Sequence, residues 1–259
     1  MTSFCYEELT SRNWAFIPSD IQSKLRRCAM LLAGCGLGCN IARDLAALGM
    51  ENFILYDGDV VELSNLNRQV FKINQVGTNK ALATAEVIRE VNPQAVVEAY
   101  PVFIQNLETI EEQVHKVDFV VNTVDYHSPV FLPLTDFAQE KGKYVFFPTN
   151  IGWGAVVMVF SPTSISMAQY LDVSPEAVCD LSVFITRLAK DYLPSHLEGL
   201  YRAFLEEGRA GKWPNIPQIM PGAQLVSVLV STLIVKLLAG LQVKTAPDFY
   251  VLDAWGGDD

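Results

Sequence analysis

The stretch D-G-D-V-V-E-L-S-N-L-N-R-Q occupies residues 57–69 and follows an apolar run, Phe53–Tyr56, that predicts a buried strand. Asp57 ends this strand about 20 residues after a glycine-rich turn, where a nucleotide-binding α/β domain places the carboxylate that binds a ribose. Polar and cationic side chains then crowd the exit of the strand: Asn65, Arg68 and Gln69. A hydride-transferring domain has no need of these groups, whereas a triphosphate could face them. The stretch therefore favours chemistry on ATP over the binding of a dinucleotide.

The glycine-rich turn lies upstream, between an apolar run at Ala29–Ala33 and a segment, 40–49, with helical spacing of its apolar residues. The glycines are Gly34, Gly36 and Gly38. They would let the backbone approach phosphate oxygens at the N-terminus of the helix, where partial positive charge is available. The spacing G-x-G-x-G is one residue shorter than the usual dinucleotide fingerprint, and a tight connection without a ligand is the alternative. Strand, turn, helix and strand together open a right-handed βαβ unit.

Strands and helices continue to alternate up to about residue 150. The periodicity predicts helices over 80–91 and 130–140, and strands over 96–100, 119–122 and 144–148. This alternation predicts a Rossmann-like α/β fold, with a doubly wound, mainly parallel sheet covered by helices on both faces.

The pattern changes after residue 150, which suggests three regions. Residues 1–26 form a polar, helical lead with a helix from about Ser19 to Arg27; residues 27–150 form the Rossmann-like part; residues 151–259 form a C-terminal part. In the last region we expect a strand at 155–160, a mostly helical crossover over 175–207, a long apolar helix and a final strand at 249–252. The C-terminal part would therefore add an antiparallel portion to the sheet.

Composition excludes several classes of protein. Half of the 259 residues are hydrophobic, so a sizeable core is possible, and the formal net charge of −10 argues against a nucleic-acid surface. Polar residues such as Gln224 and Ser227 interrupt the most apolar stretch, 223–241, so a buried or subunit-interface helix is favoured over a membrane span. An odd set of five cysteines and no secretory N-terminus predict a reducing, cytoplasmic setting.

Two further residues could act on phosphates. Lys80 opens a predicted helix and could donate to a phosphate; Asp125 follows the strand 119–122 and lies where ligands bind in parallel sheets. A carboxylate there suits Mg²⁺, which usually takes one or two protein carboxylates together with waters and phosphates. Arg68 could neutralise charge on a departing phosphate group. The competing interpretations are solvated side chains and a surface ion pair.

The cysteines carry a weaker indication. Cys179 could be a nucleophile, although most cysteines are small buried apolar residues. Cys35 and Cys39 stand in the glycine-rich turn, where they are badly placed for zinc. The sequence has no C-x-x-C pair, so no zinc site is expected.

Taken together, these residues resemble the ThiF/MoeB/HesA family, the adenylating domain related to ubiquitin-activating enzymes. The specific motif is D-x-D-x-V-E-x-S-N-L-N-R-Q at 57–69. The motif V-G-x-x-K at 76–80 and the strand-end Asp125 follow in the family's order, and P-x-I-P-Q-I-x-P-G-A at 214–223 precedes the last helix. The glycine turn departs from the family pattern by one residue.

The resemblance implies a role for each matching residue. Asp57 would bind the ribose, Asp59 would lie near the metal and phosphates, and Asp125 would be associated with Mg²⁺. Arg12 looks like the arginine that these proteins lend across a dimer interface into the partner's ATP site. The remaining assignments are contacts to the triphosphate by Asn65, Arg68 and Lys80, support of these by Gln69, and acceptance of the acyl group by Cys179 in the crossover.

The resemblance also implies an activity. We expect an ATP- and Mg²⁺-dependent adenylyltransferase, a homodimer, that activates a carboxylate as an acyl-adenylate and releases pyrophosphate. The carboxylate would be the C-terminus of a ubiquitin-like or sulfur-carrier protein, or of a peptide. Two alternatives remain: an NAD-dependent oxidoreductase built on the same βαβ opening, and a non-catalytic scaffold of the ThiF type, which the short glycine turn keeps open.

Overall fold

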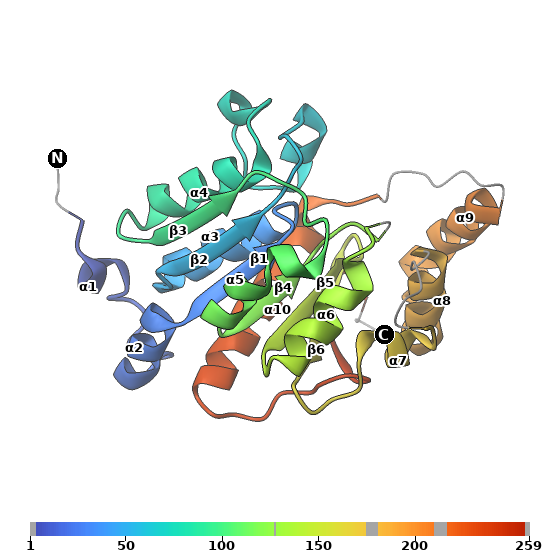
Figure 1. Cartoon of the computed structure of the whole chain (residues 1–259). Helices are drawn as coiled ribbons and strands as arrows, with labels where there is room; N and C mark the ends of the chain where they lie inside the picture. Colours follow the sequence, from blue (N-terminus) through green and yellow to red (C-terminus); the bar gives the residue numbers. More distant parts are fainter. Residues whose placement is uncertain (1–3, 127, 175–180, 210–216, 257–259) are drawn as a thin grey trace.

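The computed structural model describes residues 4–126, 128–174, 181–209 and 217–256. Within them, seven strands form one sheet in the order β3-β2-β1-β4-β5-β6-β7 (Figure 1). The strands are β1 Ala29–Ala33, β2 Asn52–Tyr56, β3 Val96–Tyr100, β4 Phe119–Asn122, β5 Tyr144–Asn150, β6 Gly154–Phe160 and β7 Phe249–Asp253. The first five run parallel, and β6 and β7 are antiparallel to their neighbours. The predicted doubly wound, mainly parallel sheet with an antiparallel portion is confirmed.

The helices connect and cover the strands. The α-helices are α1 Tyr6–Leu9, α2 Ser19–Arg27, α3 Gly38–Leu48, α4 Lys80–Val91, α5 Glu111–Lys116, α6 Phe131–Glu140, α7 Met167–Leu171, α8 Leu181–Asp191, α9 Glu198–Arg209 and α10 Met220–Leu238. Short 3₁₀ turns are η1 Leu63–Asn67, η2 Ile73–Gln75, η3 Leu107–Thr109 and η4 Ser195–Leu197. The antiparallel strands of the C-terminal part extend the sheet built by residues 27–150, so one sheet runs through both regions.

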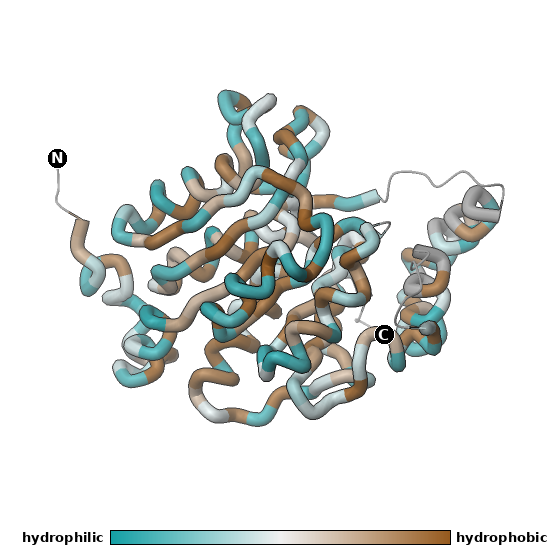
Figure 2. Tube along the Cα trace, viewed as in Figure 1, coloured by the Kyte–Doolittle hydropathy of each residue, from teal (hydrophilic) through white to brown (hydrophobic). Residues whose placement is uncertain are grey.

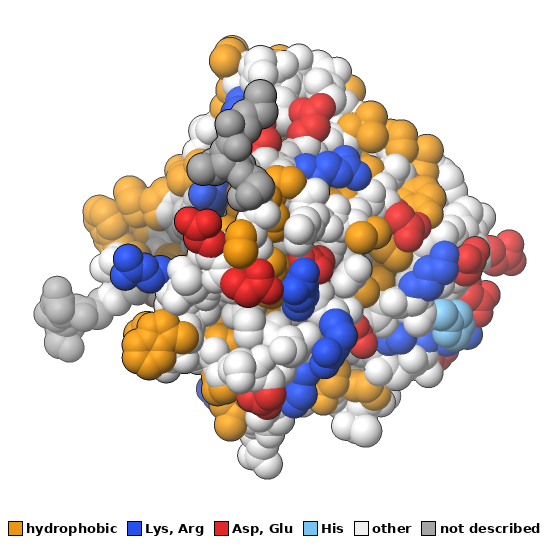
Figure 3. All heavy atoms as spheres, turned by 90° about the vertical axis from the view of Figure 1, so that its left-hand side faces the viewer, with side chains coloured by type: hydrophobic (Ala, Val, Ile, Leu, Met, Phe, Trp, Pro, Cys, Tyr) orange, Lys and Arg blue, Asp and Glu red, His pale blue; other side chains and the backbone are white. Residues whose placement is uncertain are grey.

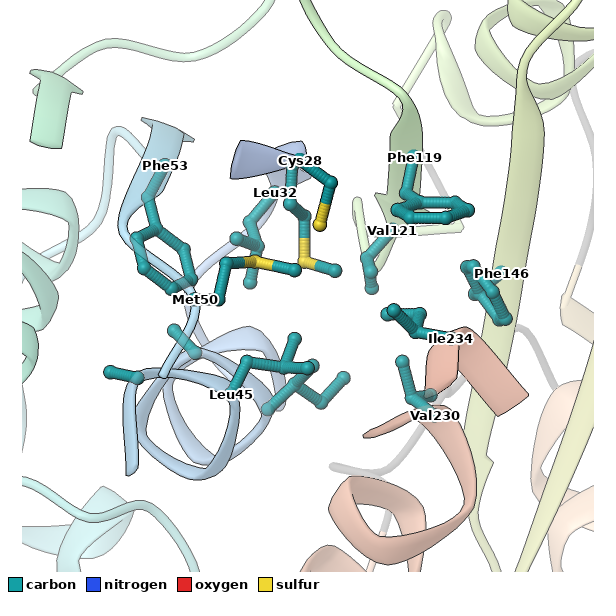
Figure 4. Packing of buried hydrophobic residues seen from close by; sticks show 14 of the residues in the cluster. Cys28, Leu32, Leu45, Met50, Phe53, Phe119, Val121, Phe146, Val230 and Ile234 are labelled. Carbon is teal, nitrogen blue, oxygen red and sulfur yellow. The ribbon is translucent and has the colours of Figure 1, made fainter. Parts of the chain in front are cut away.

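The two faces of the sheet bury separate cores, because successive side chains on a strand point to opposite faces. In β1, Met30 and Leu32 join a core with α2, α3, α4 and α10, whereas Leu31 and Ala33 join a core with α5, α6 and α7. Figure 2 shows the strands as the apolar centre of the chain, and Figure 4 shows part of the first core, where side chains of α3 and α10 meet those of the sheet. Every residue of β6 is buried.

Local signals explain where several helices begin and end. Asn79 caps α4, since its side-chain oxygen accepts hydrogen bonds from the backbone N–H groups of Ala81 and Leu82. Gly49 ends α3 in the left-handed conformation, with φ of 105°. Among the described helices, α10 is long and apolar enough to cross a membrane, with half of its most apolar window buried. Its contacts with α3, β5 and β6 account for that composition.

Candidate functional site

A cavity of about 340 Å³ opens at the carboxyl ends of the central strands. The chain leaves β1 for α3 and β2 on one side of the sheet, and later returns to β4 on the other side, so the exits of β1 and β4 form the topological switch point. Ligands of open α/β sheets bind in this crevice. The described residues that line it include Gly34, Gly36, Asp57, Asp59, Arg68, Gln69, Lys80, Phe103, Thr123, Asp125, Phe147, Thr149, Asn150 and Gln218.

The glycine turn is held against the exit of β4. Gly34 has φ of +95°, and a Cβ at this position would lie 2.4 Å from the carbonyl oxygen of Thr123. The hydroxyl of Thr123 donates a hydrogen bond to the Gly34 carbonyl at 2.8 Å. A residue other than glycine would suffer both the strained backbone and the close approach. The short turn thereby keeps the N-terminus of α3 at the cavity.

Asp57 ties β2 to the same turn. Its Oδ2 accepts a hydrogen bond from the backbone N–H of Cys35 at 2.7 Å, and its Oδ1 accepts one from the N–H of Asp59 at 2.8 Å. Burial raises the pKa of the Asp57 carboxyl, and these two hydrogen bonds oppose the rise. Each carboxylate oxygen keeps a second lone pair for a ligand on the cavity wall.

Lys80 and Asp59 form an ion pair beside Asp57. The distance from Lys80 Nζ to Asp59 Oδ2 is 3.1 Å, and the lysine side chain is largely buried while the aspartate is half-exposed. The backbone also joins the two segments, because the N–H of Lys80 donates to the carbonyl of Asp59 at 2.8 Å. This pairing presents an ammonium group at the start of α4 to the cavity.

Arg68 carries a positive charge that its neighbours do not cancel. Its Nε donates to Oε1 of Gln218 at 2.7 Å, and its Nη1 donates to the Ser64 carbonyl at 3.1 Å and to Oδ1 of Asn67 at 2.8 Å. All three acceptors are neutral, and within the described ranges no carboxylate lies at ion-pair distance from it. Burial lowers the pKa of the guanidinium, which nevertheless stays charged at neutral pH. A half-buried cation with neutral partners attracts an anionic ligand.

Gln69 supplies a second sign of a ligand. The residue is 5% exposed, and its Oε1 has no hydrogen-bond partner among the described atoms. Gly36 lies next to it, since a Cβ there would be 3.4 Å from Gln69 Nε2. Buried polar atoms are nearly always satisfied, so an unpaired acceptor on a cavity wall fits a ligand that donates to it. Thr149 Oγ1 lies on the same wall and is likewise buried and unpaired in the described structure.

Asp125 follows β4, where the sequence places it, and its exposed side chain lies on the cavity wall. No group of three or more metal-binding side chains gathers within the described part of the chain. Mg²⁺ does not need such a group, because it is usually held by one or two carboxylates and by phosphates. Asp57, Asp59 and Asp125 share the cavity wall, so the donor set fits Mg²⁺ bound together with a polyphosphate.

Other residues of interest lie away from the cavity wall. Asn65 is buried in η1, where its Oδ1 accepts a hydrogen bond from the N–H of Glu62 at 2.9 Å. Gly38 packs α3 onto β1, since a Cβ there would lie 2.9 Å from Leu32. Arg12 is exposed on the turn that follows α1. Cys179 lies outside the described residues.

Cys35 and Cys39 are poor nucleophiles in this setting. Both are fully buried, and burial raises the pKa of the Cys35 thiol well above its usual range and that of Cys39 to about 12. Both therefore remain thiols at neutral pH, and they serve to pack the turn.

An apolar wall formed by Val102, Phe103 and Ile104 closes one side of the cavity. The Phe103 ring covers Gly58, where a Cβ would lie 2.4 Å from the ring. Sequence reasoning did not identify this wall, and it included Gln218 only as part of the motif at 214–223, without a role. A glycine between Asp57 and Asp59 was the signal for a close neighbour, although it could not name that neighbour.

This structure is that of a Rossmann-type nucleotide-binding protein. It has a cavity at the switch point of a mainly parallel sheet, a glycine turn packed beside that cavity, and the cations Arg68 and Lys80 on its wall. More narrowly, the chain belongs to the ThiF family, whose family model matches residues 10–258.

Known proteins resemble the chain in sequence and in fold. A sulfur carrier protein adenylyltransferase of Thermus thermophilus is 33% identical over 141 residues, which is 54% of this chain and 51% of that protein. The adenylyltransferase and sulfurtransferase MOCS3 of Xenopus laevis is 32% identical over 142 residues, 54% of this chain and 31% of that protein. The crystal structure of PaaA superimposes with a TM-score of 0.70 at 21% identity, over 98% of this chain and 81% of that one. Escherichia coli MccB with MccA-N7isoASN gives 0.67 at 18% identity, over 95% and 71%.

The matched regions thus span about a third to a half of these two curated relatives, and the likeness to the two solved structures shows the fold.

Proposed function

We propose that this protein is an ATP- and Mg²⁺-dependent adenylyltransferase that activates a carboxylate as an acyl-adenylate and releases pyrophosphate. The observation that carries the proposal is the cavity wall. On it, Asp57 is hydrogen-bonded to the glycine turn, Arg68 has neutral partners, and Lys80 and Asp125 face the same space. Membership of the ThiF family and relatives named as adenylyltransferases support the same activity.

In the proposed complex, ATP lies across the exits of β1, β2 and β4. The ribose hydroxyls donate to the Asp57 carboxylate, and the adenine packs against the apolar wall of Val102, Phe103 and Ile104. The phosphates lie near the N-terminus of α3, where backbone N–H groups attract anions, and near Arg68 and Lys80. The donor that Gln69 Oε1 lacks in the described structure then comes from the bound nucleotide or from its water shell.

In the proposed reaction, an oxygen of the substrate carboxylate attacks the α-phosphorus of ATP. The bond from that phosphorus to the bridging oxygen breaks, and pyrophosphate leaves with the electron pair. Arg68 and Lys80 stabilise the negative charge that grows on the leaving group. Asp125 is the residue that would hold Mg²⁺, which supplies charge neutralisation at the phosphates. The protein's contribution is therefore positioning and electrostatics.

We also propose that the active enzyme is a homodimer that shares Arg12. The turn that carries Arg12 also exposes Trp14 and Phe16, whose side chains are 80% and 87% exposed. Figure 3 shows the face of the molecule that carries the N-terminal part of the chain, with hydrophobic side chains among the charged ones. Two almost fully exposed aromatic side chains on one turn support a contact surface there.

We propose that the partner's turn sits on exposed apolar side chains of the two segments that flank the Lys80–Asp59 pair. These two segments hydrogen-bond to each other, since the N–H of Val61 donates to the carbonyl of Thr78 and the N–H of Gly77 donates to that of Val61. In a twofold dimer each turn would cover this surface on the other subunit and bring Arg12 to the other cavity. The surface residues are Val60, Leu63, Ile73, Val76 and Leu82.

The substrate we propose is the C-terminal carboxylate of a ubiquitin-like or sulfur-carrier protein, or of a peptide, in the cytoplasm. The name of the Thermus thermophilus relative, a sulfur carrier protein adenylyltransferase, supports the carrier-protein branch. Cys179 remains a candidate acceptor of the acyl group. Intact-mass analysis with ATP and candidate carrier proteins, on the wild type and on Cys179→Ala, tests it: an adduct that survives the substitution removes Cys179 from the mechanism.

ATP–pyrophosphate exchange tests the adenylation step. With a panel of carrier proteins and peptides we expect carboxylate-dependent exchange, which EDTA abolishes and Mg²⁺ restores. Arg68→Ala should lower the exchange rate by about 100-fold, because it removes a charge-assisted contact to the leaving group. Arg43→Ala is the matched control, since Arg43 is a half-exposed arginine paired with Asp44. Tight NAD binding without ATP binding would instead favour an oxidoreductase, and ATP binding without exchange would favour a scaffold.

A further inference from the structure

The backbone before α10 is hydrogen-bonded to the segment that carries Arg68, although about 150 residues separate the two. Gln218 makes both contacts. Its side-chain Oε1 accepts from Arg68 Nε at 2.7 Å, and its main-chain carbonyl accepts from Asn67 Nδ2 at 2.9 Å. The segment directly before α10 is thus attached to the cavity wall at this point.

The position of Gln218 is itself supported by the sheet. Asn150, at the end of β5, donates from Nδ2 to the carbonyl of Ile219 at 3.1 Å. Gly222 lets the first turn of α10 come close, because a Cβ there would lie 2.2 Å from Asn150 Oδ1 and 2.4 Å from the Gly152 carbonyl. Gln218 is therefore held in place by its hydrogen bonds to Asn67 and Arg68 and by the close packing of Gly222 against the end of β5.

These contacts define the orientation of the Arg68 guanidinium. The group is a planar fork with five N–H bonds. Gln218 takes the Nε edge, while Ser64 and Asn67 take Nη1. Within the described residues, no acceptor meets Nη2, so this nitrogen remains for a ligand.

The chemical nature of the acceptor matters as much as its position. A carboxylate at residue 218 would form an ion pair with Arg68 and cancel the charge that the cavity presents to an anion. The amide oxygen of glutamine holds the same nitrogen and leaves the net charge intact. A neutral acceptor is therefore what an anion-binding arginine needs.

We propose that Gln218 is a positioning residue that aims Arg68 at the phosphates of ATP without neutralising it, and that it thereby joins the segment before α10 to the nucleotide site. This inference rests on the proposed function, because it takes ATP as the ligand of Arg68. Gln218 acts through Arg68 and is not itself in contact with the reacting atoms.

The test is calorimetric titration of the purified full chain with ATP and Mg²⁺, together with thermal unfolding of each variant. We expect Gln218→Ala to weaken ATP binding by about tenfold, because the Arg68 guanidinium loses the acceptor that pre-organises it for the ligand. Gln218→Glu should weaken binding further, although it keeps the shape of the side chain and a hydrogen-bond acceptor. Gln224→Ala is the matched control, six residues further on in α10, since its Nε2 contacts Met220 Sδ at 3.5 Å, and it should leave binding unchanged.

A double-mutant cycle separates positioning from general support of the fold. In the Arg68→Ala background, Gln218→Ala should have no further effect on ATP affinity, because the residue it aims is gone. If Gln218 only supports the fold, Gln218→Glu should lower the unfolding temperature less than Gln218→Ala does, and neither variant should change the affinity for ATP. If Gln218→Glu weakens ATP binding less than Gln218→Ala does, charge at this position does not matter. Either result would overturn the inference. If Gln218→Ala does not fold, Gln218→Glu and Gln218→Asn provide the same comparison.

The outcomes also distinguish this inference from the function on which it rests. A wild-type protein that does not bind ATP removes the proposed function. A wild-type protein that binds ATP, with affinity lost in Arg68→Ala but unchanged in Gln218→Ala and Gln218→Glu, removes the role of Gln218 and leaves the function standing.

Discussion

At the scale of single residues, Gly34 shows how the close approach of two loops shapes the cavity. Gly34→Ala should lower the free energy of unfolding by roughly 3 kcal/mol, because the new Cβ adds a clash with the Thr123 carbonyl to the strain of a positive φ. Gly142→Ala is the matched control, since Gly142 also has positive φ (+78°) but has no atom within 4 Å of the added Cβ. Its cost should be about 1 kcal/mol. Urea unfolding of both variants measures the difference, and equal costs would contradict the clash.

The site could be predicted residue by residue where a residue type and a strand end coincide. Asp57 and Asp125 lie on the wall of one cavity, because strand exits of a parallel sheet share an edge. Arg68 and Lys80 lie on the same wall, in the connection that follows β2 and at the start of α4. Gln218 could not be found this way. A glutamine carries no charge signal, and its contact with Arg68 joins parts of the chain that only the folded protein brings together.

The position of Phe103 on the cavity wall, like that of Gln218, was not predicted from the sequence, and it leads to a second prediction about a single residue. Phe103→Ala should weaken ATP binding by about tenfold, because it removes most of an aromatic wall from the proposed adenine site. Val96→Ala is a control, since Val96 is a 62% exposed apolar residue on β3 outside the cavity wall. Titration with ATP measures both, and unchanged affinity in Phe103→Ala would place the adenine elsewhere.

At the scale of elements, periodicity located most helices and strands well. The structure has α2 at Ser19–Arg27 and α4 at Lys80–Val91, where the sequence predicts them, and the strands agree within two residues. Short helices such as α1 and α5 were not predicted, because four to six residues are too few for a periodic signal. The long apolar helix begins at Met220, earlier than the apolar run suggested, because Pro221 fits the first turn of a helix.

The contact between His196 in η4 and Asp253 in β7 leads to a prediction on how stability depends on pH. Partial burial of Asp253 would by itself raise the pKa of its carboxyl. Hydrogen bonds from the N–H groups of Trp255 and Gly256 and from the Tyr192 hydroxyl, together with the charge of nearby His196, outweigh this effect and lower the pKa below its ordinary value. A carboxyl whose pKa is lowered by folding stabilises the fold above its unfolded pKa, near 3.9, and loses that contribution as the pH falls through the folded pKa.

Asp253→Asn should therefore lower the free energy of unfolding at pH 7 by about 1 kcal/mol, since it replaces a charged acceptor by a neutral one. The difference from the wild type should shrink at pH 3, where the wild-type carboxyl is also becoming neutral. Asp248→Asn, at an exposed aspartate before β7, should change little at either pH. Thermal unfolding at the two pH values decides: a difference that persists unchanged at pH 3 would mean that charge is not its origin.

At the scale of the whole molecule, the proposed dimer makes each cavity depend on two chains. Arg12→Ala and Arg68→Ala should each lower ATP–pyrophosphate exchange by about 100-fold. Co-expression of the two variants should restore about a quarter of the wild-type rate, because half of the dimers are mixed and each mixed dimer has one intact site. The control is a mixture of the two separately purified variant dimers under conditions without subunit exchange, and it should show no recovery. If isolated mixed dimers show no recovery, Arg12 either acts in the cavity of its own chain or takes no part in the reaction.

The sheet order has a consequence for the newly made protein. β6 and β7 are hydrogen-bonded neighbours, yet residues 161–248 separate them. On the ribosome, β6 therefore emerges well before its partner and presents an open edge made of the wholly apolar run G-A-V-V-M-V-F. Until α10 and β7 arrive, this edge can pair with other chains, and chaperones are the cell's protection against that hazard. The strand that completes the sheet thus also sets the interval during which a nascent chain is exposed to aggregation.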